Sequence, residues 1–142
     1  MIGSLLDTNV VSELARPNPS TQVRSFMRGL EGDSFLSVIT LHEVDYGIAC
    51  LPDGKRKRDI ELWLKAIEQQ FAEFILPVAR GVARQAAWLR RQAQQQGRVI
   101  HLTDALIAGT ALEQGLQLVT RNTSDFEGTG VRLVNPWPDT ER

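Results

Sequence analysis

Four acidic residues of this chain could converge on a single metal ion: Asp7, Glu43, Asp104 and Asp125. Carboxylates gathered within a few ångströms repel one another, and their pKa values rise unless a positive charge lies between them. A hard divalent cation such as Mg²⁺ prefers oxygen ligands and keeps several water molecules, which leaves coordination positions for a phosphate. Because a metal-bound water has a lowered pKa, convergence of these acids predicts metal-dependent hydrolysis of a phosphodiester bond.

Each acid also has a purely structural explanation, which spacing alone does not remove. Asp7 could simply cap a helix, and Glu43 could be the second member of a capping box that begins at Thr40. Asp104 could be a favourable charge at a helix start, and Asp125 an ordinary turn residue. Taken one at a time, these explanations are the more common ones.

The elements that would position the acids alternate between short apolar segments and longer amphipathic ones. Five apolar segments predict strands, at residues 2–6, 35–38, 74–76, 116–120 and 131–134. Helical spacing of apolar residues predicts helices between them, at about 8–15, 20–30, 40–50, 55–71, 82–96 and 103–114. This alternation predicts parallel pairing through right-handed crossovers, in a three-layer α/β/α sandwich. Ligands of such sheets bind at the carboxyl ends of the strands, where the four acids would meet.

The composition is that of a globular protein. The chain has 142 residues, of which 42% are hydrophobic and 23% charged, so we expect a single domain over residues 1–142. No apolar run approaches the roughly 18 to 20 residues of a membrane span, and the N-terminus lacks the basic start of a signal peptide. We therefore expect a cytoplasmic protein with no membrane contact. The single cysteine, Cys50, is expected to be a buried thiol in a reducing compartment.

Charge patterning adds a hypothesis about nucleic acid. The net charge of −1 gives no overall field that would attract RNA, so RNA binding would depend on local patches or on metal ions. One patch is the run Lys55–Arg58, at a helix start where positive charge is disfavoured. A second stretch contains Arg80, Arg84, Arg90 and Arg91. Either patch could contact an RNA backbone, and a solvated helix face is the alternative.

The sequence around the four acids resembles the PIN-domain family. The similar segments are LLDTNVVSEL (5–14), SVITLHEVDYGI (37–48), DALIAGTAL (104–112) and LVTRNTSDF (118–126), each with its acid in the family's order. The closing VRLVNPW (131–137) is similar to the end of the VapC-like toxins of that family. The resemblance covers nearly the whole chain. It implies a central, mainly parallel five-stranded sheet and a metal-dependent endoribonuclease.

By this resemblance the family's metal ligands carry over to the four acids, with Mg²⁺ or Mn²⁺ as the cofactor. Asn9, Thr120 and Asn122 match neighbouring polar positions and are expected to support the ligands or position water. Two histidines depart from the family's pattern: a small residue is usual at the position of His42, and a proline is common at the position of His101. Neither departure removes a ligand, and His42 is expected to lie outside the core site. The resemblance also implies an RNA substrate, a cognate antitoxin whose C-terminal segment lies across the site, and a homodimer or toxin–antitoxin hetero-oligomer.

Other functions stay open beside this one. Haloacid-dehalogenase-like phosphatases also begin with an aspartate after the first strand, but they need a second acid two residues on, where this chain has Asn9. An RNA-processing nuclease without an antitoxin is one alternative. A non-catalytic PIN-like module that binds RNA or protein is another, although no ligand is missing. A last question concerns the stripe of Trp63, Ile67 and Phe71, which we expect in the core, with a dimer surface as the alternative.

Overall fold

The sheet at the centre of the molecule has five parallel strands in the order β3-β2-β1-β4-β5. The strands are β1 (Ser4–Leu6), β2 (Ser34–Ser37), β3 (Ile75–Leu76), β4 (Gln117–Val119) and β5 (Leu133–Val134). The computed structural model describes residues 1–137, and the last five positions of the expected domain, 138–142, lie outside the described residues. The first strand of the chain is thus the middle strand of the sheet, and it pairs with β4 from the far end of the sequence.

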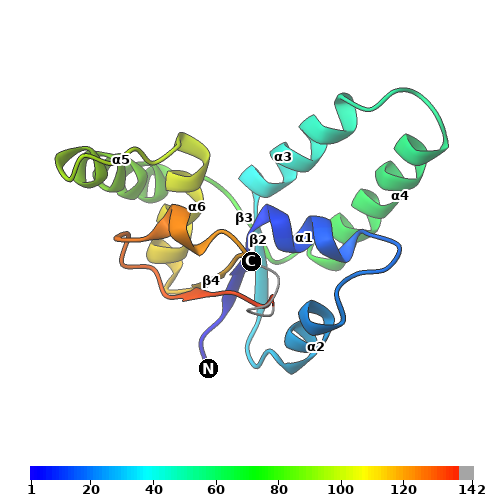
Figure 1. Ribbon diagram of the computed structural model, residues 1–142, viewed down its shortest axis with the longest axis horizontal. Coiled ribbons are helices and arrows are strands. Elements are labelled where there is room, and N and C mark those ends of the chain that lie inside the picture. Colours follow the sequence, from blue (N-terminus) through cyan, green and yellow to red (C-terminus); the bar gives the residue numbers. More distant parts are fainter. Residues whose placement is uncertain (138–142) are drawn as a thin grey trace.

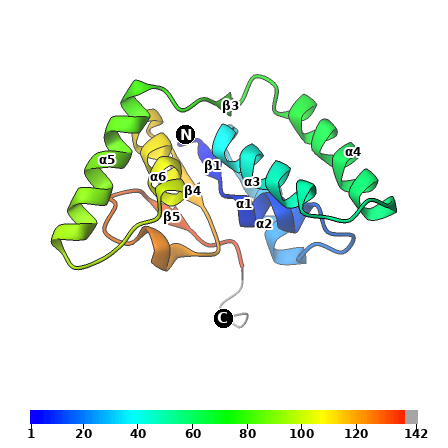
Figure 2. The ribbon, with the colours of Figure 1, turned by 90° about the horizontal axis from the view of Figure 1, so that it is seen from above.

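Helices cover both faces of this sheet (Figures 1 and 2). One face carries α1 (Thr8–Leu14), α2 (Thr21–Gly29), α3 (Val38–Ala49) and α4 (Lys55–Gln70), and the other carries α5 (Arg80–Gln95) and α6 (Leu102–Gln114). A short 3₁₀ helix, η1 (Thr123–Phe126), follows β4. The predicted three-layer α/β/α sandwich with a five-stranded parallel sheet is therefore confirmed. Among residues 1–137, none of the helices has the length and apolarity that crossing a bilayer requires.

Each face of the sheet has its own hydrophobic core, because successive residues of a strand point to opposite faces. On β1, Leu5 packs into the core beneath α5 and α6, while Leu6 packs into the core beneath α1 to α4. On β4, Leu118 and Val119 divide in the same way. The helical stripe of Trp63, Ile67 and Phe71 packs, partly buried, against the second core, so its expected place in the core is confirmed.

Small residues bring α6 close to α5 and so fix the helix that contributes Asp104. Ala105, Ala108 and Ala111 are fully buried, as their size predicts. A Cβ added at Gly109 would lie only 3.0 Å from the carbonyl oxygen of Val82 on α5. The two backbones therefore approach too closely for a side chain between them, and α6 has little freedom to shift along its neighbour.

Three local predictions were wrong. Helix α3 is capped by Ser37, whose Oγ accepts a hydrogen bond from the backbone N–H of Ile39 at 3.0 Å, so Thr40 opens no capping box. Glu43 consequently lies in the second turn of α3 and not in the first. Cys50 is exposed and not buried, because it follows the buried Ile48 by two residues, which on a helix places it on a different face.

Candidate active site

Asp7 lies where β1 ends and α1 begins, at the carboxyl edge of the sheet. It is the N-cap of α1, and its Oδ1 accepts a hydrogen bond from the backbone N–H of Thr8 at 2.8 Å. Its Oδ2 accepts hydrogen bonds from the Thr120 hydroxyl at 2.8 Å and from Asn9 Nδ2 at 3.3 Å. Burial raises the pKa of Asp7 above its ordinary value of 3.8, the charge of Asp125 adds to the rise, and these three hydrogen bonds oppose it.

Polar residues from the start of α1 and from the segment after β4 hold this acid. Thr120, fully buried just after β4, also accepts hydrogen bonds from Asn9 Nδ2 at 3.3 Å and from the backbone N–H of Asn122 at 3.1 Å. The other amide atom of Asn9, Oδ1, accepts from the backbone N–H of Arg121 at 3.1 Å. The structure thus places Asn9 and Thr120 in direct contact with Asp7, while Asn122 takes part through its backbone. The acid is oriented by the segment after the neighbouring strand.

Glu43 approaches the same region from α3 and is half-buried. Burial raises its pKa above the ordinary value of 4.5, and the negative charge of Asp7 raises it further. The Thr8 hydroxyl and the charge of His42 oppose this rise, and His42 itself is exposed, as expected. The Thr8 hydroxyl is buried beside Glu43 and makes no hydrogen bond of standard geometry among the described residues.

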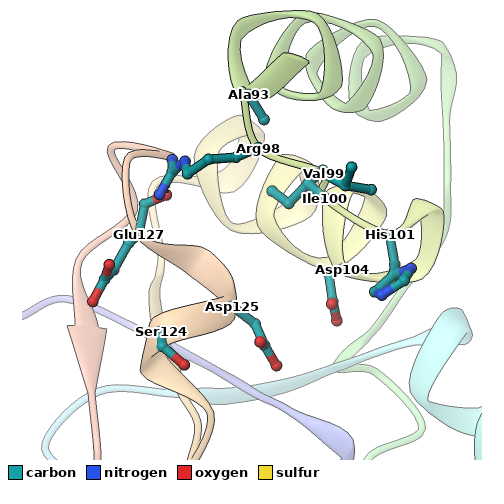
Figure 3. A pocket seen from close by; sticks show the side chains of 9 residues that line it. All are labelled: Ala93, Arg98, Val99, Ile100, His101, Asp104, Ser124, Asp125 and Glu127. Carbon is teal, nitrogen blue, oxygen red and sulfur yellow. The ribbon is translucent and has the colours of Figure 1, made fainter. Parts of the chain in front are cut away.

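Asp104 and Asp125 come from the opposite side of the sheet. Asp104 stands in the first turn of α6, which begins after His101, and Asp125 lies in η1. Figure 3 shows both carboxylates directed into the same small cavity. The pKa of Asp104 is raised from 3.8 to about 6, mainly by burial and further by the charges of Asp7, Asp125 and Glu43, while the charge of His101 opposes the rise.

These pKa effects show that all four predicted acids share one electrostatic field. The charges of the other three acids raise the pKa of Asp104, and the charge of Asp125 raises the pKa of Asp7. Among residues 1–137, however, no three acidic, histidine or cysteine side chains already form a metal-binding cage. The donor chemistry still suits a hard divalent cation, since all four groups offer oxygen and their repulsion is relieved by positive charge. The four carboxylates are thus near enough for their charges to affect one another, but the described residues do not form a ready-made metal site.

Three of these acids line hollows of the surface. A polar cavity of about 150 Å³ includes Asp104 and Asp125 and is bounded by the segment after α5 and by η1 (Figure 3). A larger groove of about 1120 Å³ includes Glu43, Thr8 and Asn9 and extends between α1, α3 and α4. The basic run at the start of α4 reaches this groove through Lys55 and Arg56. Asp104 and Asp125 therefore line a small polar cavity, while Glu43 lines a wide groove that contains many apolar side chains.

Sequence reasoning missed four polar or charged residues of the small cavity: Arg98, Ser124, Glu127 and, as a lining residue, His101. Arg98 follows the glycine that ends α5, a position with no motif around it, so no signal in the sequence could have identified it. Ser124 lies within the TSD sequence of η1, next to Asp125. It could have been found as a polar neighbour of a candidate ligand.

Comparison with known proteins gives a consistent result. The family model of the PIN domain matches residues 4–130. The chain is 39% identical to Toxin FitB of Neisseria gonorrhoeae, over 95% of this chain and 99% of that protein. It is 36% identical to VapC ribonuclease Y4jK of Sinorhizobium fredii, over 94% of this chain and 96% of that protein.

Solved structures show the same likeness in three dimensions. The crystal structure of FitAcB from Neisseria gonorrhoeae superposes with a TM-score of 0.88 at 39% identity, covering 94% of this chain and 98% of that one. A toxin-antitoxin complex from Klebsiella pneumoniae superposes with a TM-score of 0.71 at 26% identity, covering 94% and 98%. Both likenesses extend over nearly the full length of each chain.

Proposed function

This chain belongs to the PIN-domain family, and from that premise we propose that it is a Mg²⁺- or Mn²⁺-dependent endoribonuclease, the toxin of a toxin–antitoxin pair. The relatives named as a ribonuclease and as a toxin are similar over nearly the whole chain, which supports carrying both properties over. The proposal depends on one observation: four acids from separate elements lie near enough to affect one another's pKa values. They are Asp7, Glu43, Asp104 and Asp125.

These four acids would hold the cation. When such an ion is bound, the chemistry available at the site is activation of a water molecule and neutralisation of charge on the phosphate. The chain's own contribution begins with Thr120 and Asn9, whose hydrogen bonds favour the ionised form of Asp7 despite its burial. Because these donors come from a strand end and a helix start, the carboxylate is oriented before any substrate arrives.

The wide groove supports the proposal of an antitoxin partner. Its apolar side chains include Ile48, Leu51, Ile60 and Trp63, and its end at Glu43 is acidic. An extended or helical segment with apolar residues and a cationic residue would complement this surface. Such a segment would cover the acids from the side of α3 and α4, and would thereby exclude RNA.

Cleavage of a single-stranded oligoribonucleotide by the purified chain tests the nuclease proposal. We expect cleavage in Mg²⁺ or Mn²⁺, loss of cleavage when the ion is chelated, and loss of at least about 100-fold in rate for Asp7→Asn. Asp45→Asn is the matched control, because Asp45 is an exposed acid on α3 that lines neither hollow. Full activity of Asp7→Asn, or cleavage that persists in chelator, would contradict the proposal.

A further inference from the structure

The small cavity beside Asp104 and Asp125 has one positively charged arginine on its lining, Arg98. The backbone places it there by turning sharply at the end of α5. Gly97 takes a positive φ of 74°, and the N–H of Arg98 donates to the carbonyl oxygen of Ala93 at 2.8 Å. The Arg98 side chain then crosses from the end of α5 to the loop after η1 (Figure 3).

The guanidinium is held at a defined position. Nη2 of Arg98 donates to the carbonyl oxygen of Glu127 at 2.6 Å, and it lies against Gly128, where a Cβ would collide with it. Gly128 also has a positive φ of 78°, so two requirements at this position favour glycine. One N–H of the planar fork is used in this contact, and a guanidinium has five. The remaining donors are available to a ligand at the exposed rim of the cavity.

The charges are arranged in sequence along this cavity. Asp104 and Asp125 stand at one end and Arg98 at the other, and Ser124 lies on η1 beside Asp125 (Figure 3). The carboxylate of Glu127 is directed away from the guanidinium, because the backbone of that residue makes the contact. A polyanion that brings one phosphate to the acids and their cation would therefore meet a fixed cation next to it.

Resting on the proposed nuclease function, we propose that this cavity is a subsite for RNA, in which Arg98 binds the backbone phosphate adjacent to the scissile one. An arginine fork matches the oxygens of a phosphate, and the anchored side chain loses little further freedom on binding. Adjacent phosphates of one strand would then each meet a positive charge: the scissile one the cation held by the acids, and its neighbour the guanidinium of Arg98.

A purely structural role for Arg98 makes a different prediction. If the residue only ties the segment after α5 to the loop after η1, any donor to the Glu127 carbonyl would replace it, and the charge of the RNA would not matter. Arg98→Gln removes the charge, and an uncharged RNA linkage separates the two roles, because only a phosphate contact of the wild type depends on the charge of that linkage. Arg24→Gln on α2 is the matched control, because Arg24 is exposed on the opposite face of the sheet (Figure 2).

The test is a cycle of enzyme and substrate changes. We expect wild type to lose about ten-fold in kcat/KM when the linkage on one side of the scissile bond carries an uncharged methylphosphonate. Arg98→Ala and Arg98→Gln should lose the same factor in kcat/KM on unmodified RNA. The methylphosphonate should cause no further loss in these variants, since the substitution and the uncharged linkage remove the same contact. Arg24→Gln should behave as wild type. The subsite would be overturned if the losses from the Arg98 substitution and from the methylphosphonate multiplied, or if kcat/KM were unchanged in both Arg98 variants.

Binding without turnover separates this inference from the nuclease proposal. In the Asp7→Asn background, the slope of log affinity against log salt for single-stranded RNA should fall by about 0.7 on Arg98→Gln, the value for one lost phosphate contact, and stay constant on Arg24→Gln. A reduced slope, together with a wild-type chain that never cleaves RNA in Mg²⁺ or Mn²⁺, would support the subsite while refuting the nuclease. Cleavage with an unchanged slope would do the reverse.

Discussion

The hydroxyl of Thr120 donates a 2.8 Å hydrogen bond to Oδ2 of Asp7, across 113 positions of sequence. It is the strongest of the interactions that lower the pKa of this buried acid. The Oγ1 atom of Thr120 also accepts hydrogen bonds from Asn9 Nδ2 and from the backbone N–H of Asn122. A single hydroxyl therefore links the acid of the first strand to the loop that carries Asp125.

Thr120→Val should raise the pKa of Asp7 further, because the favoured charged form loses its main donor. The ascending limb of kcat/KM against pH should then move to higher pH, which a pH profile of RNA cleavage measures. The free energy of unfolding should fall by about 1 to 3 kcal/mol, since buried donors lose their acceptor. Thr120→Ser keeps the hydroxyl and should leave the pH profile in place; an unmoved profile in the valine variant would refute this role.

Asp104→Asn should stabilise the ion-free protein at neutral pH. The folded-state pKa of about 6 lies above the ordinary 3.8, so the folded state binds the proton more tightly and stability falls as pH rises through this range. The penalty is complete above about pH 6 and absent below about pH 4. Because the side chain is half exposed, solvent screening reduces the gain to about 1 kcal/mol.

Urea unfolding in chelator measures this difference at about pH 7.5 and about pH 3.5. The variant should exceed wild type only at the higher pH, and Mg²⁺ should stabilise wild type more than the variant. Asp45→Asn, an exposed change on α3, should show neither effect. A stability gain of the same size at both pH values would mean that repulsion among the acids is not its cause.

Gly47 offers a way to block the wide groove without harming the fold. It lies on α3, lines the groove, and a Cβ added there meets no atom within 4 Å. Gly47→Gln should therefore raise the free energy of unfolding by about 0.5 to 1 kcal/mol through helix propensity. It should also weaken binding to an antitoxin by about ten-fold, because the new side chain occupies the groove.

The measurement is the affinity for the protein encoded by the adjacent reading frame, with Gly47→Ala as the control. Alanine gives the same gain in helix propensity with little added volume, so its complex should keep nearly wild-type affinity. Equal affinity for the glutamine and alanine variants would place the partner elsewhere on the surface.

Thr40 has a fully buried hydroxyl without a hydrogen-bond partner among residues 1–137. Thr40→Val replaces this hydroxyl with a methyl group of similar size, so the free energy of unfolding should rise by about 1 kcal/mol. Thr40→Ser keeps the unpaired group and removes packing, and it should destabilise. Thermal unfolding of the two variants checks the order, and a less stable valine variant would reveal a partner for the hydroxyl.

The sequence predicted the fold well because its strands are short apolar runs separated by amphipathic helices. It failed where two signals competed at one helix start. Ser37 and Thr40 are both good caps, and Ser37 prevails because β2 ends there, which moves Glu43 into the second turn. Cys50 was misplaced since residue type, and not its face on α3, decided the prediction.

For the site, position along the chain made the four acids candidates, and the resemblance to the PIN-domain family selected them. The hydrogen bonds between Asp7 and Thr120 could not be derived from spacing, because they depend on the pairing of β1 with β4. Arg98 was invisible for a different reason: its position depends on a glycine turn and on a contact with the Glu127 carbonyl, 29 residues further along the chain.

The central place of β1 has a consequence for the time at which activity can arise during synthesis. A nascent chain exposes Asp7 early, but its partner strand β4 begins only at Gln117. Until that segment has left the ribosome, one edge of β1 has no neighbour and the hydroxyl of Thr120 is missing. Truncated products that stop before β4 therefore contain Asp7, Glu43 and Asp104 without the strand and the hydroxyl that orient Asp7.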